Sequence, residues 1–254
     1  EQGQDMYWRI IRINGDGSIR LIYDGTSAHA NGEDNADRQI GTSTYNSSSN
    51  DNAYVGYMYG TPGSSSYAET HANTNDSTIK AYLDDWYKRV FSGTSYESYI
   101  VDNIFCNDRS FSDSNVGTGY GTNITYYRWY TTNRIELTCL NQGDRFTVND
   151  EVIGNGDLIY PVGLITNDEA YLSGGYEVSN SSYYLYSGNI FWTMSPAGYV
   201  NGRADVRRID SNGSLSYYVG SVTNLRDVRP VINLMTNSLK FGNGTMSNPY
   251  TVEG

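Results

Sequence analysis

The chain carries few of the side chains that usually form a catalytic centre, and their spacing matches no common catalytic motif. His29 and His71 are its only histidines, and both lie in a segment rich in Asn, Ser and Gly. A Gly-x-x-x-x-Gly-Lys-Ser/Thr loop, a Gly-x-Ser-x-Gly turn and a His-Glu-x-x-His helix are all missing from the sequence. Histidines in such a segment are usually solvated, so we expect neither of them to act in catalysis.

Carboxylates are numerous, so composition alone allows a catalytic acid and base of the glycosidase type. The candidates are Asp84, Asp85, Asp144, Asp150, Glu151, Asp168 and Glu169. Each has a structural explanation in a solvated helix face, a turn or a helix N-cap. The segment DSNGS at Asp210 lacks the rest of a calcium loop, and two cysteines with two histidines do not predict a zinc site. We therefore predict no catalytic residue, no metal and no cofactor.

The two cysteines are Cys106 and Cys139. In a chain so rich in Tyr, Asn and Ser, they predict one disulfide of the kind found in extracellular proteins. It would close a loop of roughly 30 residues and add ~3 kcal/mol to the free energy of unfolding. The alternative is a pair of unrelated buried thiols.

Composition and charge limit the classes of partner that the protein can bind. The 254 residues carry a net charge of −11, which opposes binding to nucleic acid and to anionic membranes. No apolar run reaches the ~18–20 residues of a membrane span. The chain begins at Glu1 rather than Met, so we expect a trimmed protein whose anchor lies in a segment absent from this chain.

Local patterns predict a β-rich α+β domain. Two apolar runs around Asn14–Gly17 predict a hairpin over Tyr7–Gly25. Ile79, Leu83, Trp86 and Val90 recur at helical spacing and predict a helix over Ser77–Phe91. Further helices are expected within Ser95–Phe105 and, from a capping box, Thr166–Gly175. The expected strands are Leu158–Ile165, Asn189–Met194, Ala204–Asp210, Ser214–Val219 and Val228–Leu234, with a hairpin in the tail.

The segment Thr26–Ser77 is poor in aliphatic residues, which predicts a functional loop or a partly ordered insertion. No internal repeat and no proline-rich linker divides the chain. We expect a single domain over residues 1–254, with that segment as a loop or insertion.

Residues from Asn180 to Arg226 are mostly Tyr, Arg, Ser, Gly and Asn, the residue types that antibody paratopes use. The simpler reading is a Tyr-rich sheet face exposed to water. We instead predict a ligand-binding face on alternate strand positions, although a shift of one residue in register would exchange the set. Its predicted members are Tyr199, Asn201, Arg203, Asp205, Arg207, Tyr217, Tyr218, Asn224 and Arg226.

Six motifs resemble a large family of Gram-positive bacterial surface proteins of uncharacterised function. They are WRIIRINGDGSIRLIYDG, LDDWY, IFCNDRS, GLITNDEAYLSGG, FWTMSPA and VRPVINLM with GNGTMSNPY, in this order from Trp8 to Tyr250. The resemblance implies a C-type lectin-like fold of the type seen in formylglycine-generating enzymes. Some members with this fold are similar to the variable proteins of diversity-generating retroelements, and some are attached to pilin-like N-terminal segments.

The resemblance further implies that Trp192, Pro196, Arg229 and Pro230 are structural, with Arg229 pairing a buried or half-buried acceptor. The chain departs from the enzymes because it has no cysteine after Cys139, so their oxidase chemistry is not expected. It also lacks the Glu-Pro-Asn or Gln-Pro-Asn triplet of calcium-dependent lectins, so the fold does not imply sugar binding.

Together these observations predict a non-enzymatic recognition or adhesion module at a bacterial surface. It would present residues 198–226 as a retroelement-diversified binding face to a protein or glycan ligand on a cell or phage surface. Two alternatives stay open: a structural, pilin-like subunit of a surface filament, and a surface glycan hydrolase.

Overall fold

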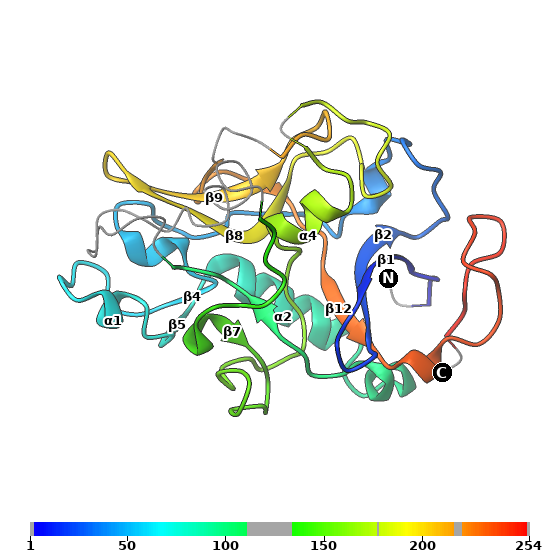
Figure 1. Cartoon of the computed structure of the whole chain (residues 1–254), viewed down its shortest axis with the longest axis horizontal. Coiled ribbons are helices and arrows are strands. Elements are labelled where there is room, and N and C mark those ends of the chain that lie inside the picture. Colours follow the sequence, from blue (N-terminus) through cyan, green and yellow to red (C-terminus); the bar gives the residue numbers. More distant parts are fainter. Residues whose placement is uncertain (1–2, 111–133, 177, 216–219, 253–254) are drawn as a thin grey trace.

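The computed structural model describes residues 3–110, 134–176, 178–215 and 220–252. It is a mixed α+β structure built mostly from sheets, as predicted (Figure 1). The first sheet has the order β1-β2-β12, formed by Tyr7–Ile13, Ile19–Gly25 and Val231–Leu234. The predicted hairpin is confirmed, and Gly17, at a φ of 86°, takes the left-handed conformation that its turn requires.

The second sheet has the order β10-β9-β8-β11-β3 and carries most of the predicted binding face. Its strands are β8 Phe191–Val200, β9 Arg203–Ile209, β10 Gly220–Ser221, β11 Arg226–Asp227 and β3 Thr42–Ser43. Two small antiparallel pairs complete the sheets: β4 Met58–Tyr59 with β5 Asn75–Asp76, and β6 Phe105–Cys106 with β7 Arg145–Phe146.

Two of the predicted helices begin at the predicted caps. Ser77 caps α2, Thr78–Val90, by accepting a hydrogen bond from the Lys80 N–H. Thr166 and Glu169 form the predicted capping box of α4, Asn167–Leu172. The remaining helical elements are short: α1 Tyr67–Thr70, η1 Ala36–Arg38, η2 Asn52–Val55, η3 Ser95–Tyr99, η5 Gln142–Asp144 and η6 Thr236–Ser238.

Some predicted elements differ from the structure. Residues 158–165 form no strand and pair only through an isolated bridge between Gly163 and Val231, while η3 replaces the helix expected within Ser95–Phe105. The tail hairpin is present as two isolated bridges, Leu239 with Val252 and Thr245 with Asn248. Four residues of the predicted strand Ser214–Val219 lie outside the described residues.

The segment Thr26–Ser77 is not a plain loop. It holds η1, η2, α1 and three short strands, and it supplies Tyr45, Val55, Tyr57 and Met58 to the hydrophobic core. The few aliphatic residues of this segment are compensated by buried tyrosines. The segment therefore belongs to the packed body of the protein.

Both histidines are buried rather than solvated, which corrects the prediction. The His29 ring lies between two carboxylates, with Nδ1 2.8 Å from Glu33 and Nε2 2.7 Å from Asp37. His71 packs on the Tyr67 ring, and its Nε2 lies 3.3 Å from the Asn52 amide nitrogen. Burial, with the nearby Arg109 charge, lowers the pKa of His71 to about 3.

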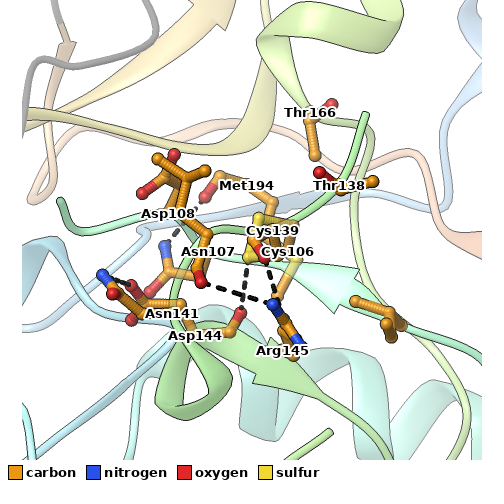
Figure 2. Close-up of a disulfide and its surroundings, with 12 residues drawn as sticks. Cys106, Asn107, Asp108, Thr138, Cys139, Asn141, Asp144, Arg145, Thr166 and Met194 are labelled. Atoms are coloured by element: carbon orange, nitrogen blue, oxygen red, sulfur yellow. Dashed lines mark hydrogen bonds between the residues drawn. A yellow bond between two sulfur atoms is a disulfide. The ribbon is translucent and has the colours of Figure 1, made fainter. Parts of the chain in front are cut away.

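The cysteines form the predicted disulfide, with Cα atoms 5.5 Å apart (Figure 2). Cys106 belongs to β6, and the Arg145 side chain from the paired strand β7 donates a hydrogen bond to the Cys139 carbonyl. The disulfide therefore fastens the chain around Cys139 to the β6–β7 pair. A disulfide fits an extracellular protein.

One buried carboxylate, Asp24 at the end of β2, accepts hydrogen bonds from three arginines. Its Oδ2 lies 2.6 Å from Arg9 Nε, and its Oδ1 lies 2.6 Å from Arg38 and 2.8 Å from Arg229. The pairing of Arg229 with a buried acceptor is thus confirmed. Arg229 also donates to the Tyr23 and Leu185 carbonyls, and burial lowers its pKa to about 10 against the opposing charge of Asp24.

Substitution of Asp24 tests how much this carboxylate contributes to the free energy of unfolding. We expect Asp24→Asn to lower the free energy of unfolding by about 3–5 kcal/mol, because it leaves Arg38 and Arg229 buried without a counter-charge. Urea unfolding measures the change. Asp85→Asn, in the exposed pair with Arg89, is the control and should change stability by less than about 0.5 kcal/mol. Equal effects of the two substitutions would contradict this view.

The lowered pKa of His71 predicts that the protein loses stability in acid. Its folded pKa lies below its unfolded value, so its contribution is complete above about pH 6.5 and decreases as the pH falls toward 3. Between pH 7 and 5 the loss is about 2 kcal/mol. Unfolding titrations at both pH values measure it, and His71→Gln should remove this part of the pH dependence. An unchanged dependence in the variant would assign the acid sensitivity to other groups.

Candidate functional site

Strand β8 is the rigid base of the predicted binding face. Its residues from Phe191 to Gly198 are all buried. The Trp192 indole donates a hydrogen bond to the Ser43 carbonyl at 3.0 Å and meets the Tyr45 ring edge-on. The Thr193 hydroxyl donates to the Arg207 carbonyl of β9. Trp192 and Pro196 are therefore structural, in agreement with the expectation.

The exposed part of the face begins at the turn between β8 and β9. Asn201 and Gly202 both have positive φ, 54° and 75°, as a tight two-residue hairpin turn requires. The side chains from Val200 to Arg203 are exposed, and half of Val200 is open to solvent. In Figure 1 this turn projects from the body at the opposite end of the molecule from the two termini.

Two other segments meet the hairpin at its tip. Tyr199 donates its hydroxyl to the Asn50 carbonyl at 2.9 Å, and the Ala204 N–H donates to the Ser49 carbonyl. On the other side, the Val222 N–H donates to the Ala204 carbonyl and leads into an exposed turn. We name the exposed or half-buried residues of these segments the hairpin-tip surface: Asn50, Tyr199, Val200, Asn201, Arg203, Thr223, Asn224 and Leu225.

The structure corrects two members of the predicted face. Asp205 and Arg207 are buried, with exposed fractions of 4% and 3%. Strand β8 carries register irregularities between Trp192 and Gly198, which break the simple alternation along the hairpin. Both faces of β9 are covered at these positions. Asp205 lies 2.9 Å from Arg203, and its burial raises its pKa while that charge opposes the shift.

The other predicted members divide into three groups. Tyr199, Asn201, Arg203 and Asn224 belong to the hairpin-tip surface. Arg226 is half-buried, donates a hydrogen bond to the Leu225 carbonyl and lies in β11, which pairs with Ser43 and with the start of β8 away from the hairpin tip. Tyr217 and Tyr218 lie outside the described residues. The structure therefore brings Tyr199, Asn201 and Arg203 together at the hairpin tip, and it places Asn224 in the exposed turn that follows Val222.

The hairpin-tip surface combines an aromatic ring, amide groups, one guanidinium and two uncovered aliphatic side chains. Leu225 is 63% exposed, and the charge of Arg203 is balanced by Asp205. Such a mixture can bury apolar area and can donate and accept hydrogen bonds at its margin. This is the composition of surfaces that bind by contact.

The candidate carboxylates lie elsewhere and serve the fold. Asp84 is buried rather than on a solvated helix face, and it accepts a hydrogen bond from the buried Lys80 at 2.7 Å. Burial raises the pKa of Asp84, and the Lys80 charge opposes the shift. Asp144 pairs with Arg109, and Glu169 pairs with Arg20, both at 2.6 Å. Over the described ranges, no group of His, Cys, Asp and Glu could hold a metal ion.

Sequence reasoning did not find the contribution of Asn50 or of the turn at Thr223–Leu225. Both segments consist of small polar residues that resemble any solvated loop. Their place beside the hairpin depends on backbone hydrogen bonds to Ala204, which no local pattern encodes.

Comparison with known proteins adds no relative. No family model matches the chain, and no curated protein or solved structure matches it. Within the described residues, no helix is long and apolar enough to cross a membrane.

Unfolding measurements can test which residues of the predicted binding face are buried and which are exposed. We expect Arg207→Ala to lower the free energy of unfolding by about 2–3 kcal/mol, because it leaves a cavity where a long side chain was buried. Asn224→Ala should change it by less than about 0.5 kcal/mol. Urea midpoints compare the two. An Arg207 variant as stable as the parent would mean that this side chain faces outward, as first predicted.

Proposed function

We propose that the chain is a non-enzymatic recognition module that binds its ligand through the hairpin-tip surface. The observation that carries this proposal is the exposed hairpin tip, where Val200 is half open to solvent next to Tyr199, Asn201 and Arg203 at the end of a buried sheet. When a partner covers an exposed aliphatic side chain that is surrounded by polar groups, apolar surface is removed from water, and this favours binding. The surface is preorganised, because β8 is buried from Phe191 to Gly198, up to the residues that form the tip.

The place of this surface in the molecule supports the same function. It lies at the far end from both termini (Figure 1). A chain held through either end would leave the hairpin tip accessible to a partner. The disulfide favours an extracellular location, and we propose display at a bacterial cell surface, in line with the family resemblance.

The fold supports the proposal by analogy alone. The C-type lectin-like architecture that the motifs imply is compatible with the observed α+β organisation, with a buried Trp192 in β8 and with the buried ion pair of Arg229 and Asp24. A protein or a glycan on a cell or phage surface is the proposed class of ligand. Variation of residues 198–226 by a retroelement is part of this proposal, restricted to the exposed positions.

Binding is favoured over catalysis because the candidate acids and bases are engaged in the fold. Asp84, Asp144 and Glu169 each face a buried cation. A hydrolase would need two carboxyl groups about 5–10 Å apart across an open cleft. The carboxylate at the tip, Asp205, is buried and paired with Arg203.

The test compares two matched triple variants on an array of bacterial surface glycans and extracellular proteins. The tip variant carries Val200→Ser, Arg203→Lys and Leu225→Ser. The control carries Val178→Ser, Arg89→Lys and Ile159→Ser, which are exposed positions outside the hairpin-tip surface. We expect the tip variant to lose about tenfold or more in affinity for any ligand of the parent, because covered apolar contacts and the Arg fork are removed.

Equal melting temperatures of the two variants establish that folding is unaffected. A ligand retained by the tip variant would place recognition elsewhere on the chain. The filament alternative has its own signature. If the parent binds no array member and sedimentation shows association that rises with concentration and vanishes in the tip variant, the same surface joins copies of the chain.

A further inference from the structure

Helix α2 carries a buried lysine that the recognition surface does not use. The Lys80 side chain is fully buried, whereas Lys88 and Lys240, the other two lysines of the chain, are exposed. Lysine is almost never fully buried unless its ammonium group is paired. No residue of α2 belongs to the hairpin-tip surface, so the burial of this amine needs a separate explanation.

Two carboxylates face the Lys80 amine. Asp84, one helical turn further along α2, places Oδ2 2.7 Å from Nζ, because residues four apart lie on the same face of a helix. Asp76 Oδ1, from β5, lies 3.1 Å from the same nitrogen. The Asp84 side chain is 11% exposed and that of Asp76 is 36% exposed, so the first carboxylate lies on the inner side of the amine and the second lies toward solvent.

Asp84 is poorly placed to remain an anion. Its Oδ2 accepts a hydrogen bond from Lys80, but its Oδ1 is buried and has no hydrogen-bond partner among the described residues. Burial raises the pKa of Asp84, the Lys80 charge opposes the shift, and the Asp76 charge adds to it. A buried carboxylate with an unbonded oxygen is costly. Transfer of one proton from the ammonium group to Asp84 removes both charges and leaves an amine beside a carboxylic acid.

An amine and a carboxylic acid held in this way are a nucleophile and its electrophile. Lys80 Nζ lies within hydrogen-bond reach of the carboxyl group whose carbon it would attack. Fixed contact between two reacting groups corresponds to an effective concentration of roughly 10⁵–10⁸ M. Burial of the Lys80 side chain also keeps bulk water, which would favour hydrolysis, away from the pair.

Asp76 is placed to carry the proton that such a reaction must move. It contacts the same nitrogen from the solvent side, where water can leave. The nearby phenol of Tyr57 does not compete for this role. Burial, with the charges of Asp84 and Asp76, raises the pKa of Tyr57 well above its usual value, so its hydroxyl stays neutral.

We propose that Lys80 and Asp84 condense to an amide bond that bridges one turn of α2. The Lys80 amine attacks Cγ of the protonated Asp84, and Asp76 accepts a proton from the nitrogen. Asp76 returns that proton to the leaving hydroxyl group, the C–O bond breaks and one water departs. An N–C bond thus replaces a C–O bond, nothing is oxidised or reduced, and the amide N–H still faces Asp76.

The intact mass of the purified full chain, measured after reduction of its disulfide, tests this directly. We expect a mass lower than that of the sequence by one water, about 18 Da. A chain with the full mass of its sequence would overturn the proposal and leave Lys80 and Asp84 as an ion pair.

Digestion with trypsin locates the loss. Trypsin does not cut after an acylated lysine, so residues 39–88 should remain one peptide, and its fragment spectrum should show no backbone cleavage between Lys80 and Asp84. Ring closure at the Asp16–Gly17 pair also releases one water. A loss found there, with normal cleavage after Lys80, would overturn the bridge.

Variants connect the reaction to the named residues. In newly synthesised chain followed by mass over time, Asp76→Asn should slow the loss of water about tenfold or more, because the proton carrier is removed. Asp85→Asn is the matched control, since Asp85 is an exposed carboxylate on the same helix and should react as the parent does. Equal rates in the parent and in Asp76→Asn would overturn the role of Asp76.

Lys80→Met removes the nucleophile and should keep the full mass of its sequence. If this variant fails to fold, the mass and the tryptic peptide of the parent still decide the outcome. Neither measurement involves the hairpin-tip surface, so failure of the bridge and failure of the recognition function are separate results.

Discussion

The structure depends on one buried carboxylate, Asp24, and the three arginines that surround it. Arg9 comes from β1, Arg38 from the segment after β2, and Arg229 from the chain just before β12. A buried charge of this kind is tolerated only when its partners are fixed. The ion pairs of Asp24 therefore join the β1–β2 hairpin, the segment after β2 and the chain just before β12.

This arrangement explains how a chain with few aliphatic residues forms a stable domain. Tyr45, Tyr57 and Tyr87 replace aliphatic side chains in the core, and buried ion pairs such as Arg109 with Asp144 replace part of the apolar contact. Each pair satisfies donors and acceptors that would otherwise be costly to bury. Many of the remaining polar residues are exposed and are not part of this core.

Elements with a local cause were predictable from the sequence. The hairpin turn at Gly17, the Ser77 cap, the capping box at Thr166 and the disulfide all follow from neighbouring residues or a simple count. Burial of Arg207 was not predictable, because it depends on β8 irregularities and on what covers both faces of β9. A pocket lined by Arg12, Ile104, Thr138 and Glu169 brings together segments that are distant in the sequence, and no pattern in any one of them indicates it.

The tight turn at Asn201 and Gly202 has a consequence for how this protein can change over generations. Side chains on either side of the turn point to solvent, whereas Ala204 and Val206, only a few residues further on, are fully buried. Substitutions at the tip change the exposed surface and leave the core untouched. The character of the surface and the stability of the fold thus depend on separate residues of the same short hairpin.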